Sequence, residues 1–343
     1  MSISLSKNTD SRIIHPGSDP ISAPYFPFVH GSRERIDKYI ISHPVPYAKR
    51  LPDQTRLIFK QHNLPVSLHS CQFTRSNRRR SLLSENAKTV KGKKYFWDTK
   101  TLMLAAASRS GFNLCAFSTP ECRSLCLGHT SGQLGIQHKN YRQFLLKNPA
   151  QLAHFLKSVW FKVDPLSFLR QLVLEIKIAA LELDLEKVDH RLCIRLNCLS
   201  DLQWWTWLDL AALSKDYGVV FYDYTKRPIP PNIDGYHLTF SISEHESSWK
   251  TAQKYLDMGL NAAIVVGGKD TSSRLGMLKS KATETQEELV ERGSFIIGST
   301  AYPVVNGDLT DLRFLDAPGS VVILKAKGPE ALRSESPFIY RNL

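Results

Sequence analysis

The sequence predicts an α/β fold with parallel strands, arranged as a full or partial (β/α) barrel. Two observations lead to this prediction. Short apolar runs typical of strands recur about every 20 to 30 residues, and segments with helical spacing of apolar residues separate many of them. This alternation favours βαβ units, in which the strands are parallel. Several runs are apolar throughout, as expected for strands that are covered on both faces.

An open, doubly wound sheet is the alternative to a barrel. No GxGxxG motif follows any predicted strand, so nothing in the sequence indicates a dinucleotide-binding sheet. A chain of 343 residues is long enough for one large domain or two smaller ones. We expect a tail and basic extension at residues 1–85, a cysteine loop and barrel domain at residues 86–330, and a C-terminal tail at residues 331–343.

The N-terminal extension differs in composition from the rest. Residues 1–30 are rich in Ser, Pro, Asp and His and predict a loose tail, and residues 32–82 predict an irregular or helical segment. The stretch 75–94, RSNRRRSLLSENAKTVKGKK, is strongly basic. It is either a solvated surface loop or a segment that contacts phosphates, and it carries no recognisable RNA- or DNA-binding motif.

The main domain is expected to begin with a strand that enters the core and to continue with alternating helices and strands. The expected strands lie within residues 95–108, 190–201, 219–226, 236–244, 261–268 and 319–328. The expected helices lie within residues 140–163, where Asn148 and Pro149 start a second helix, and within residues 165–187, 202–218 and 247–260.

The charge and hydropathy of the chain limit its partners and its location. The net charge of +13 predicts a polyanion nearby, such as nucleic acid, a phosphorylated ligand or an acidic partner. No apolar run approaches the roughly 20 residues that cross a bilayer, and the N-terminus lacks the apolar core of a secretory signal. We therefore expect a cytoplasmic protein without a membrane partner. Thiols stay reduced there, so clustered cysteines indicate metal or redox chemistry rather than disulfides.

Three of the six cysteines lie in one short stretch, GFNLCAFSTPECRSLCLGHTSG, at residues 111–132. Cys115, Cys122 and Cys126 have the spacing C-x6-C-x3-C. Together with His129 they could close a tetrahedral zinc site, although the usual CxxC pairs are absent. Alternatively, three thiolates could hold a [4Fe-4S] cluster with one open iron, or the thiols could serve only packing. A structural role is expected for Cys71, Cys193 and Cys198.

Polar and charged residues follow the predicted strands repeatedly. Because ligands bind at the carboxyl ends of parallel strands, these residues predict a polar pocket there. Taken singly, each could be a helix cap or a turn residue, and Asp201 is of a type that often caps a helix. The candidates for cofactor or substrate binding are Asn197, Asp201, Asp223, Tyr224, Lys226, Ser241, Glu244, Asp308, Asp311, Arg313, Lys325 and Lys327.

A set of ordered motifs points to a known family. The motifs are NAK at 86–88, CAFSTPECRSLCLG at 115–128, RLNCLSD at 195–201, FYDYTK at 221–226, HLTFSISE at 237–244, NAAIVV at 261–266, NGDLTDLRFLD at 306–316 and LKAKG at 324–328. Over residues 86 to 328 the sequence resembles the gene product 88 family of phage and plasmid proteins. The resemblance implies a cysteine loop ahead of a barrel, similar in outline to radical S-adenosylmethionine proteins.

The chain departs from both patterns at identifiable positions. The radical S-adenosylmethionine enzymes usually have CxxxCxxC, which the loop does not match. Cys198 stands where the gene product 88 family usually has a small residue, and Asn306 where it often has Asp. If Cys198 lay opposite Cys115, it could supply a fourth ligand and close the metal site.

Three functions are compatible with these features, and we favour the first. It is an iron–sulfur enzyme in which Cys115, Cys122 and Cys126 hold a [4Fe-4S] cluster, S-adenosylmethionine binds the open iron, and the polar candidates hold cofactor and substrate. The second is a zinc-stabilised, non-catalytic barrel that binds nucleic acid or a protein. The third is a metal-free enzyme acting on a phosphorylated small molecule, with anion contacts from Lys226, Arg313, Lys325 and Lys327.

Overall fold

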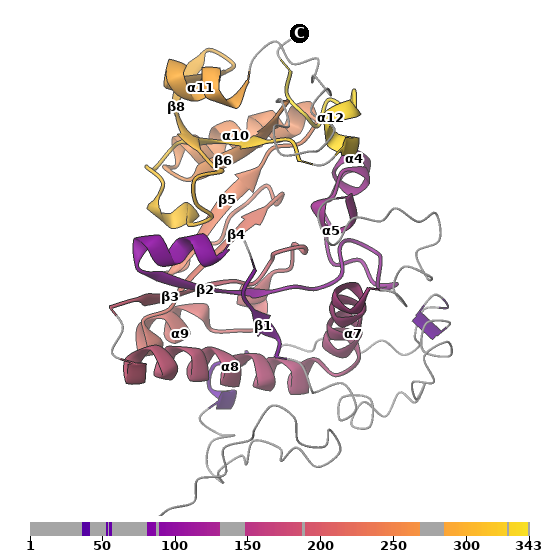
Figure 1. Cartoon of the computed structure of the whole chain (residues 1–343), viewed down its shortest axis with the longest axis vertical. Coiled ribbons are helices and arrows are strands. Elements are labelled where there is room, and N and C mark those ends of the chain that lie inside the picture. Colours follow the sequence, from indigo (N-terminus) through magenta and orange to yellow (C-terminus); the bar gives the residue numbers. More distant parts are fainter. Residues whose placement is uncertain are drawn as a thin grey trace, which may run out of the picture.

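The computed structural model has one nine-stranded sheet with helices packed along it (Figure 1). It describes residues 36–41, 53, 55–56, 81–86, 89–130, 148–186, 189–267, 285–327 and 329–341. The strand order is β1-β2-β3-β4-β5-β6-β9-β8-β7. The strands are β1 (Leu83–Ser84), β2 (Trp97–Leu102), β3 (Arg191–Arg195), β4 (Val220–Thr225), β5 (Tyr236–Ser241), β6 (Asn261–Val266), β7 (Ser294–Ile297), β8 (Thr300–Asn306) and β9 (Val321–Lys325).

The sheet is mostly parallel. Every neighbouring pair from β2 to β8 is parallel, and only the outer strands β1 and β7 are antiparallel to their neighbours. Among the described residues β1 and β7 do not pair with each other, so the sheet is open and the prediction of a full barrel is not confirmed. Strands β2 to β6 follow one another in sequence order, without the reversal that marks a doubly wound sheet.

Helices of different length connect the strands. The longer ones are α7 (Pro149–Val163), α8 (Pro165–Glu186), α9 (Leu210–Tyr217), α10 (Glu246–Asp257) and α11 (Gln286–Arg292). The shorter ones are α4 (Pro120–Ser124), α5 (Leu127–Thr130), α12 (Pro329–Arg333) and the 3-10 helices η1 (Thr89–Tyr95), η3 (Trp204–Thr206) and η4 (Arg313–Leu315). Asn148 caps α7 by accepting hydrogen bonds from the N–H groups of Ala150 and Gln151, as its place before Pro149 predicts.

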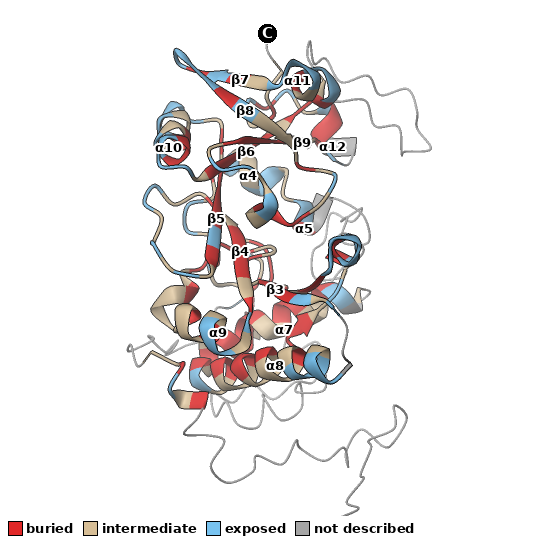
Figure 2. Ribbon diagram, turned by 90° about the vertical axis from the view of Figure 1, so that its left-hand side faces the viewer, coloured by how far each residue is buried: buried red, intermediate tan, exposed pale blue. Residues whose placement is uncertain are grey.

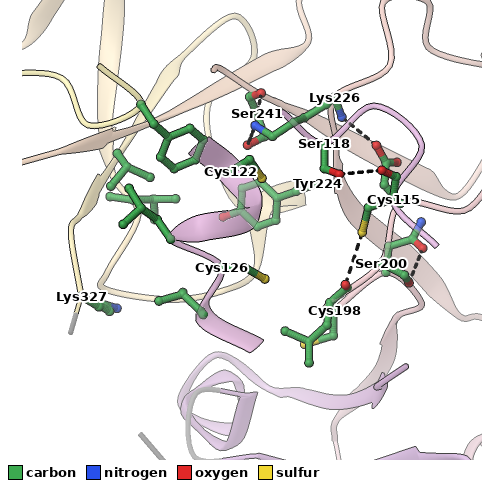
Figure 3. A pocket seen from close by; sticks show the side chains of 18 of the residues that line it. Cys115, Ser118, Cys122, Cys126, Cys198, Ser200, Tyr224, Lys226, Ser241 and Lys327 are labelled. Carbon is green, nitrogen blue, oxygen red and sulfur yellow. Dashed lines mark hydrogen bonds between the residues drawn. The ribbon is translucent and has the colours of Figure 1, made fainter. Parts of the chain in front are cut away.

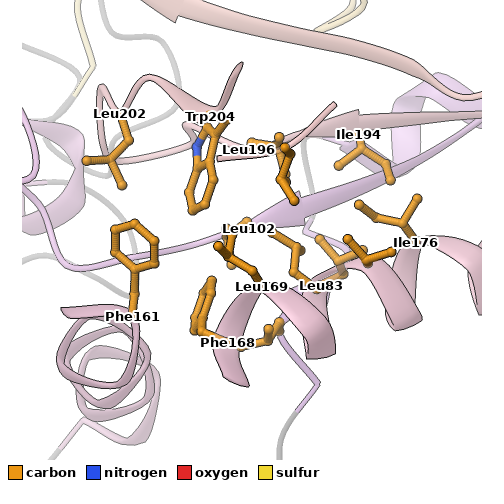
Figure 4. Packing of buried hydrophobic residues seen from close by; sticks show 14 of the residues in the cluster. Leu83, Leu102, Phe161, Phe168, Leu169, Ile176, Ile194, Leu196, Leu202 and Trp204 are labelled. Carbon is orange, nitrogen blue, oxygen red and sulfur yellow. The ribbon is translucent and has the colours of Figure 1, made fainter. Parts of the chain in front are cut away.

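A large apolar cluster fills the space between α7, α8, α9 and strands β1 to β5 (Figure 4). Its aromatic centre is formed by Phe161, Phe168 and Trp204, which are completely buried. The ring of Phe161 lies 5.3 Å from that of Phe168 and 5.2 Å from that of Trp204. Ile176 of α8 and Ile194 of β3 continue the cluster along the sheet. This packing fixes the lower half of the sheet as drawn in Figure 1.

A second apolar cluster lies between α10, α11 and strands β5 to β9. Tyr255 of α10, Leu289 of α11 and Ile323 of β9 are among its completely buried members. The central strands are therefore buried for most of their length, which Figure 2 shows as red ribbon. This burial explains the apolar runs of β6 and β9.

Part of the N-terminal extension is anchored to the helices. Asp37 forms a bidentate ion pair with Arg170 of α8, with both N–O distances at 2.8 Å. The hydroxyl of Tyr39 donates to Asp216, and Ile40 forms a β-bridge with Leu208. The predicted helical character is seen in residues 36–37, 53 and 55–56, while most of residues 1–80 lie outside the described residues.

Six predicted strands are confirmed as β2, β3, β4, β5, β6 and β9, and the predicted helices as α7, α8, α9 and α10. The helix predicted within residues 202–218 is shorter than expected, because η3 precedes it and Asp209 caps it by accepting from the N–H of Ala212. Gly218 ends it in the left-handed conformation, with φ of 63°. The sequence did not predict β1, β7 or β8. The predicted boundaries at residues 85 and 330 stay predictions.

Candidate functional site

A cavity of about 430 Å³ lies at the carboxyl ends of the parallel strands (Figure 3). Its walls come from the last residues of β3, β4, β5, β6 and β9, from the cysteine segment at residues 115–127, and from residues 331–339. In Figure 1 these carboxyl ends face α4, α5 and α12. The cavity therefore occupies the position that the polar strand-end residues predict.

The cysteine segment is held in shape by a helix cap. Thr119 is the N-cap of α4, and its hydroxyl accepts from the N–H of Cys122 at 3.1 Å. Pro120 occupies the first helical position, where its missing N–H has no consequence. Cys122 lies within α4 and Cys126 in the turn before α5. The short helix thus turns both thiols toward the same cavity.

Cys115, Cys122 and Cys126 all line this cavity, and so does Cys198. Figure 3 shows the sulfur atoms around one space, with Cys122 and Cys126 on the α4 side and Cys115 and Cys198 across from them. The thiol of Cys115 donates to the backbone carbonyl of Leu199 at 3.5 Å. Three of these thiols come from one segment and the fourth from the loop after β3.

Burial controls the protonation of the three clustered thiols. It raises the pKa of Cys115 to about 12, and neighbouring thiols and Asp201 add to the shift. It also raises the pKa of Cys122 and of Cys126. At neutral pH the three sulfurs therefore carry protons when nothing positively charged is bound beside them. A bound metal ion would displace those protons.

Asp201 ties the cysteine segment to the strands. Its N–H donates to the carbonyl of Leu114 at 2.8 Å, and Cys115 forms a parallel β-bridge with Asp201. Its carboxylate accepts from the hydroxyl of Thr225 at 2.9 Å and from the N–H of Lys226 at 3.0 Å. Asp201 lines the cavity, and through these hydrogen bonds it also connects the loop after β3 to the end of β4 and to the cysteine segment.

Glu244 has a related positioning role. It does not line the cavity, and its carboxylate accepts from the hydroxyl of Thr119 at 2.9 Å. Because Thr119 also caps α4, Glu244 connects the end of β5 to the start of the cysteine helix. The side chain of Glu244 is only 8% exposed, so this hydrogen bond is well shielded from water.

Lys226 is the buried cation next to the thiols. Its ammonium donates to the carbonyl and the hydroxyl of Ser241, both at 2.9 Å, and lies 5.0 Å from the ring centre of Phe338. Burial lowers its pKa, while the neighbouring Cys122 and Glu244 oppose that shift. In the described part of the chain no carboxylate forms an ion pair with it. Lys226 therefore brings a buried positive charge to this wall of the cavity, with the carboxylates of Glu244 and Asp201 nearby but not in direct ion-pair contact among the described residues.

A buried ion pair forms another wall. Arg195 of β3 and Asp311 both line the cavity, and their N–O distance is 3.0 Å. The guanidinium also lies 4.8 Å from the ring centre of Tyr224. Burial alone would lower the pKa of Arg195, but the Asp311 carboxylate outweighs it and the pKa is raised. Within the described residues Arg195 Nε and the Tyr224 hydroxyl have no hydrogen-bond partner.

The last wall carries paired surface charges. Lys327 forms an ion pair with Asp308 at 2.6 Å, and Lys325 pairs with Glu287. Asp308 also accepts from the N–H of Lys325 at 3.0 Å. Lys325 is therefore not the isolated buried lysine that its strand position allowed, because a carboxylate balances its charge.

The structure brings most of the predicted site residues together. Those that line the cavity are Asn197, Asp201, Tyr224, Lys226, Ser241, Asp308, Asp311, Lys325 and Lys327. Asp223, Glu244 and Arg313 do not line it. Asp223 is completely buried and accepts from the N–H of Asn197 and the hydroxyl of Tyr236, and Arg313 pairs with Asp316 at 3.1 Å. Their contacts are those of residues that hold neighbouring segments in place.

Asn197 lines the cavity, but its amide is engaged inside its own loop. The amide oxygen accepts from the hydroxyl of Ser200, the N–H of Leu202 and the indole of Trp204, and the amide nitrogen donates to the Leu202 carbonyl. These four bonds shape the loop that presents Cys198.

The sequence prediction missed Arg195 and the C-terminal residues Phe338 and Ile339 as cavity-lining residues. For Arg195 a signal existed, because the predicted strand segment 190–201 contains both Arg195 and Asn197, and side chains two residues apart on a strand share a face. For residues 338 and 339 the sequence held no comparable signal. They reach the cavity because the segment pairs with the end of β6, through Val266 and Tyr340.

Within the described residues no group of three or more His, Cys, Asp or Glu side chains is arranged to hold a metal ion. The cysteines share one cavity without converging on one point. The side chain of His129, the expected fourth zinc ligand, lies outside the described residues, as does Cys71. In the part of the chain that is described, no helix has the length and apolar character needed to span a bilayer.

Comparison with known proteins identifies the family. The gene product 88 family matches residues 75–342, which is most of the chain. The protein belongs to the gene product 88 family. No curated protein and no solved structure matches it, and none of the comparisons supports a similarity to radical S-adenosylmethionine proteins. The family match covers the cysteine segment and every wall of the cavity.

Proposed function

We propose that this gene product 88 protein is an iron–sulfur enzyme, with Cys115, Cys122 and Cys126 as ligands of a [4Fe-4S] cluster. The observation that carries the proposal is that the three thiols share one cavity with the polar strand-end residues. A cavity of about 430 Å³ falls within the size range of small-molecule sites. A purely structural metal would need no such space, because structural sites are closed by four protein ligands.

The three thiols are chemically suited to hold an iron–sulfur cluster. Thiolates are the usual ligands of iron–sulfur clusters, and the three thiols are shielded from water, as their raised pKa values reflect. The separate positions of the sulfurs mean that their side chains would have to rotate on loading. When bound, the cluster would supply one electron to the sulfonium of S-adenosylmethionine, and the open iron would anchor that cofactor.

The residues of the chain would bind, orient and shield the ligands. Lys226 supplies a positive charge beside Cys122, which offsets the negative charge of the ligated thiolates. The buried pair of Arg195 and Asp311, with Tyr224 on top of the guanidinium, offers polar contacts to a substrate deep in the cavity. Phe338 and Ile339 add apolar surface to the wall of the cavity.

Metal analysis of protein purified without oxygen tests the proposal. We expect iron and acid-labile sulfide in equal amounts close to four per chain after reconstitution, roughly as a [4Fe-4S] cluster requires. Cys122→Ala should abolish iron binding. Cys193→Ala is the matched control, because this buried thiol bonds to Thr99 at 3.2 Å and does not line the cavity. Colourless protein without iron, or equal iron in both variants, would contradict the proposal.

A zinc site is the second candidate, and Cys198 is the observation that favours it. Cys198 lines the same cavity, so four thiols are available and could close a tetrahedral site. Cys198→Ala distinguishes the two. A three-thiolate cluster with an open iron keeps its iron in this variant, whereas a four-thiolate zinc site loses zinc. Wild-type protein with one tightly bound zinc and no iron would favour the non-catalytic function.

A further inference from the structure

An exposed surface of the protein combines aromatic rings with unpaired lysines. It is formed by η1 and the residues beside it, on the left of Figure 1 in purple. We call it the aromatic–basic patch and define it as Val90, Lys91, Lys94, Tyr95, Phe96 and Arg191, all of which are exposed. Tyr95 and Phe96 are 46% and 62% exposed. Two adjacent exposed aromatic side chains next to cations are uncommon on a surface that contacts only water.

The patch is rigid, because η1 is fixed at its start and along its inner side. Asn86 and Thr89 cap each other's N–H groups at 2.9 Å and 3.1 Å. Gly92 lies so close to β2 that an added Cβ would be 2.9 Å from the hydroxyl of Thr99. The inner ridge of Thr89 and Gly92 is buried, which turns the other residues of this 3-10 helix outward.

Side chains three residues apart are aligned on a 3-10 helix, and this arranges the charges in a row. Lys91 and Lys94 therefore lie above one another on the exposed side. In the described part of the chain neither lysine pairs with a carboxylate, whereas Lys93 is balanced by Glu85 at 3.4 Å and Asp98 at 3.6 Å. Within the described residues Lys91 and Lys94 thus have no carboxylate partner. Arg191, at the start of β3, is also exposed, and its guanidinium lies 5.9 Å from the ring centre of Trp97.

Phe96 is held in an unfavourable backbone conformation. Its φ is 61°, in the left-handed region that large side chains rarely adopt. Its N–H donates to the Lys93 carbonyl at 3.2 Å, and its carbonyl accepts from the N–H of Arg191 at 2.9 Å. Its ring lies edge-on to His190, with 5.9 Å between ring centres. Such strain at an exposed aromatic residue indicates a binding role, because packing does not require the ring.

We propose that the aromatic–basic patch binds single-stranded nucleic acid, with bases stacked on Phe96 and Tyr95 and phosphates contacted by Lys91, Lys94 and Arg191. Exposed rings beside rows of cations are the elements with which proteins bind single strands without sequence preference. A duplex would offer its phosphates but not its base faces. The net charge of +13 strengthens attraction of a polyanion to this surface. The proposal does not depend on the function of the cavity.

Binding of a fluorescently labelled single strand of about 15 nucleotides, measured by anisotropy, tests the proposal. We expect binding that weakens as salt rises from about 50 to about 200 mM. Lys91→Gln with Lys94→Gln should lower the salt slope by about 1.4, because each lost contact removes about 0.7. Phe96→Asn should weaken binding about 5-fold or more, and Asn tolerates the left-handed backbone, so the fold is kept.

Matched controls lie on other elements. Lys250→Gln with Lys254→Gln removes the same charge from the exposed side of α10, and Leu185→Ala removes an exposed apolar side chain from α8. Both controls should bind as the wild type does. The proposal is overturned if no single strand binds at low salt, if the patch variants bind like their controls, if a duplex binds equally well and Phe96→Asn has no effect, or if only anionic vesicles bind.

Discussion

On strand β3, Ile194 belongs to the apolar cluster that packs against α8, and the next residue, Arg195, lies on the opposite face and lines the cavity. The same alternation continues on β4, where Phe221 packs in the apolar cluster and Tyr224 lines the cavity. Successive side chains of a strand point to opposite faces, so one sequence builds both surfaces. On β3 the helix face presents the apolar residues Leu192 and Ile194, whereas the cavity face carries the charge of Arg195.

The difference shows how the protein separates stability from function. Apolar burial on the helix face is non-directional and tolerates small changes of shape. The ion pair on the cavity face is directional, and its side chains are only 13% and 3% exposed. A buried pair adds little net stability, because the loss of hydration offsets the attraction of the charges. Because stability does not explain the pair, we expect its role to be contact with a ligand.

The largest effect should come from breaking the pair on one side. Asp311→Ala leaves Arg195 charged and buried without its partner, and we expect a loss of about 3–5 kcal/mol in the free energy of unfolding. The double variant Arg195→Met with Asp311→Leu should recover most of that loss, because no charge remains to be buried. Urea denaturation of the wild type and both variants measures this. An unchanged stability of Asp311→Ala would contradict the assignment of a buried charge pair.

A change on the helix face should lower stability without affecting the cavity. Ile194→Ala removes completely buried atoms and should cost about 2–5 kcal/mol, depending on how far the cluster relaxes. If the proposed cluster is present, the iron content of the folded protein should stay the same, because Ile194 does not line the cavity. Denaturation together with iron analysis below the unfolding transition checks both expectations. Loss of iron from folded Ile194→Ala would show that the two faces are not independent.

The strands that the sequence predicted are those with both faces covered. β6 and β9 lie inside the sheet, and their sequences contain continuous apolar runs. β7 and β8 were not recognised, because β7 has only four residues and β8 contains Pro303, which argues against a strand. β7 is an edge strand and β8 lies next to it, and both bury few of their residues, so their sequences carry a weaker pattern.

The sequence identified cavity residues where their position at the end of a strand is enough to place them. It did not identify them where the outcome depends on the face of the sheet to which a side chain points. Lys226 and Ser241 line the cavity as expected, but Asp223 does not, because its side chain points to the helix face. Helix α4 was missed although Thr119 before Pro120 is a recognisable start signal. Phe338 lines the cavity because its segment pairs with the end of β6, which is distant in sequence. Local sequence patterns do not encode such pairing.

Asp223 is a buried polar residue on the helix face of β4, and its titration should contribute to the pH dependence of stability. Burial raises the pKa of Asp223 from 3.8 to about 7. The folded protein therefore keeps a proton that the unfolded chain releases, so the contribution of Asp223 to stability is largest below pH 4 and is lost as pH rises toward 7. The slope from this group approaches about 1.4 kcal/mol per pH unit at its steepest.

Asp223→Asn isolates this contribution. The amide oxygen can still accept from the N–H of Asn197, and the Tyr236 hydroxyl can accept from the amide nitrogen. We expect the difference in unfolding free energy between the wild type and the variant to change between pH 4 and pH 7 and to be constant above pH 8. Other groups titrate equally in both proteins, so a difference that is flat over the whole range would contradict the raised pKa of Asp223.

The smallest effect is expected where the cysteine segment meets the sheet. Thr119→Ala removes the cap of α4 and leaves Glu244 without its hydroxyl donor, whereas Thr119→Ser keeps both bonds. The cap is worth about 1 kcal/mol, and without it the first turn of α4 should fray. Cys122 should then react faster with a thiol reagent in metal-free protein, which mass spectrometry of the labelled peptide can measure. Equal labelling rates of Cys122 in Thr119→Ala and Thr119→Ser would contradict this expectation. They would mean that packing holds α4 in place, and not the hydrogen bonds of Thr119 to Cys122 and Glu244.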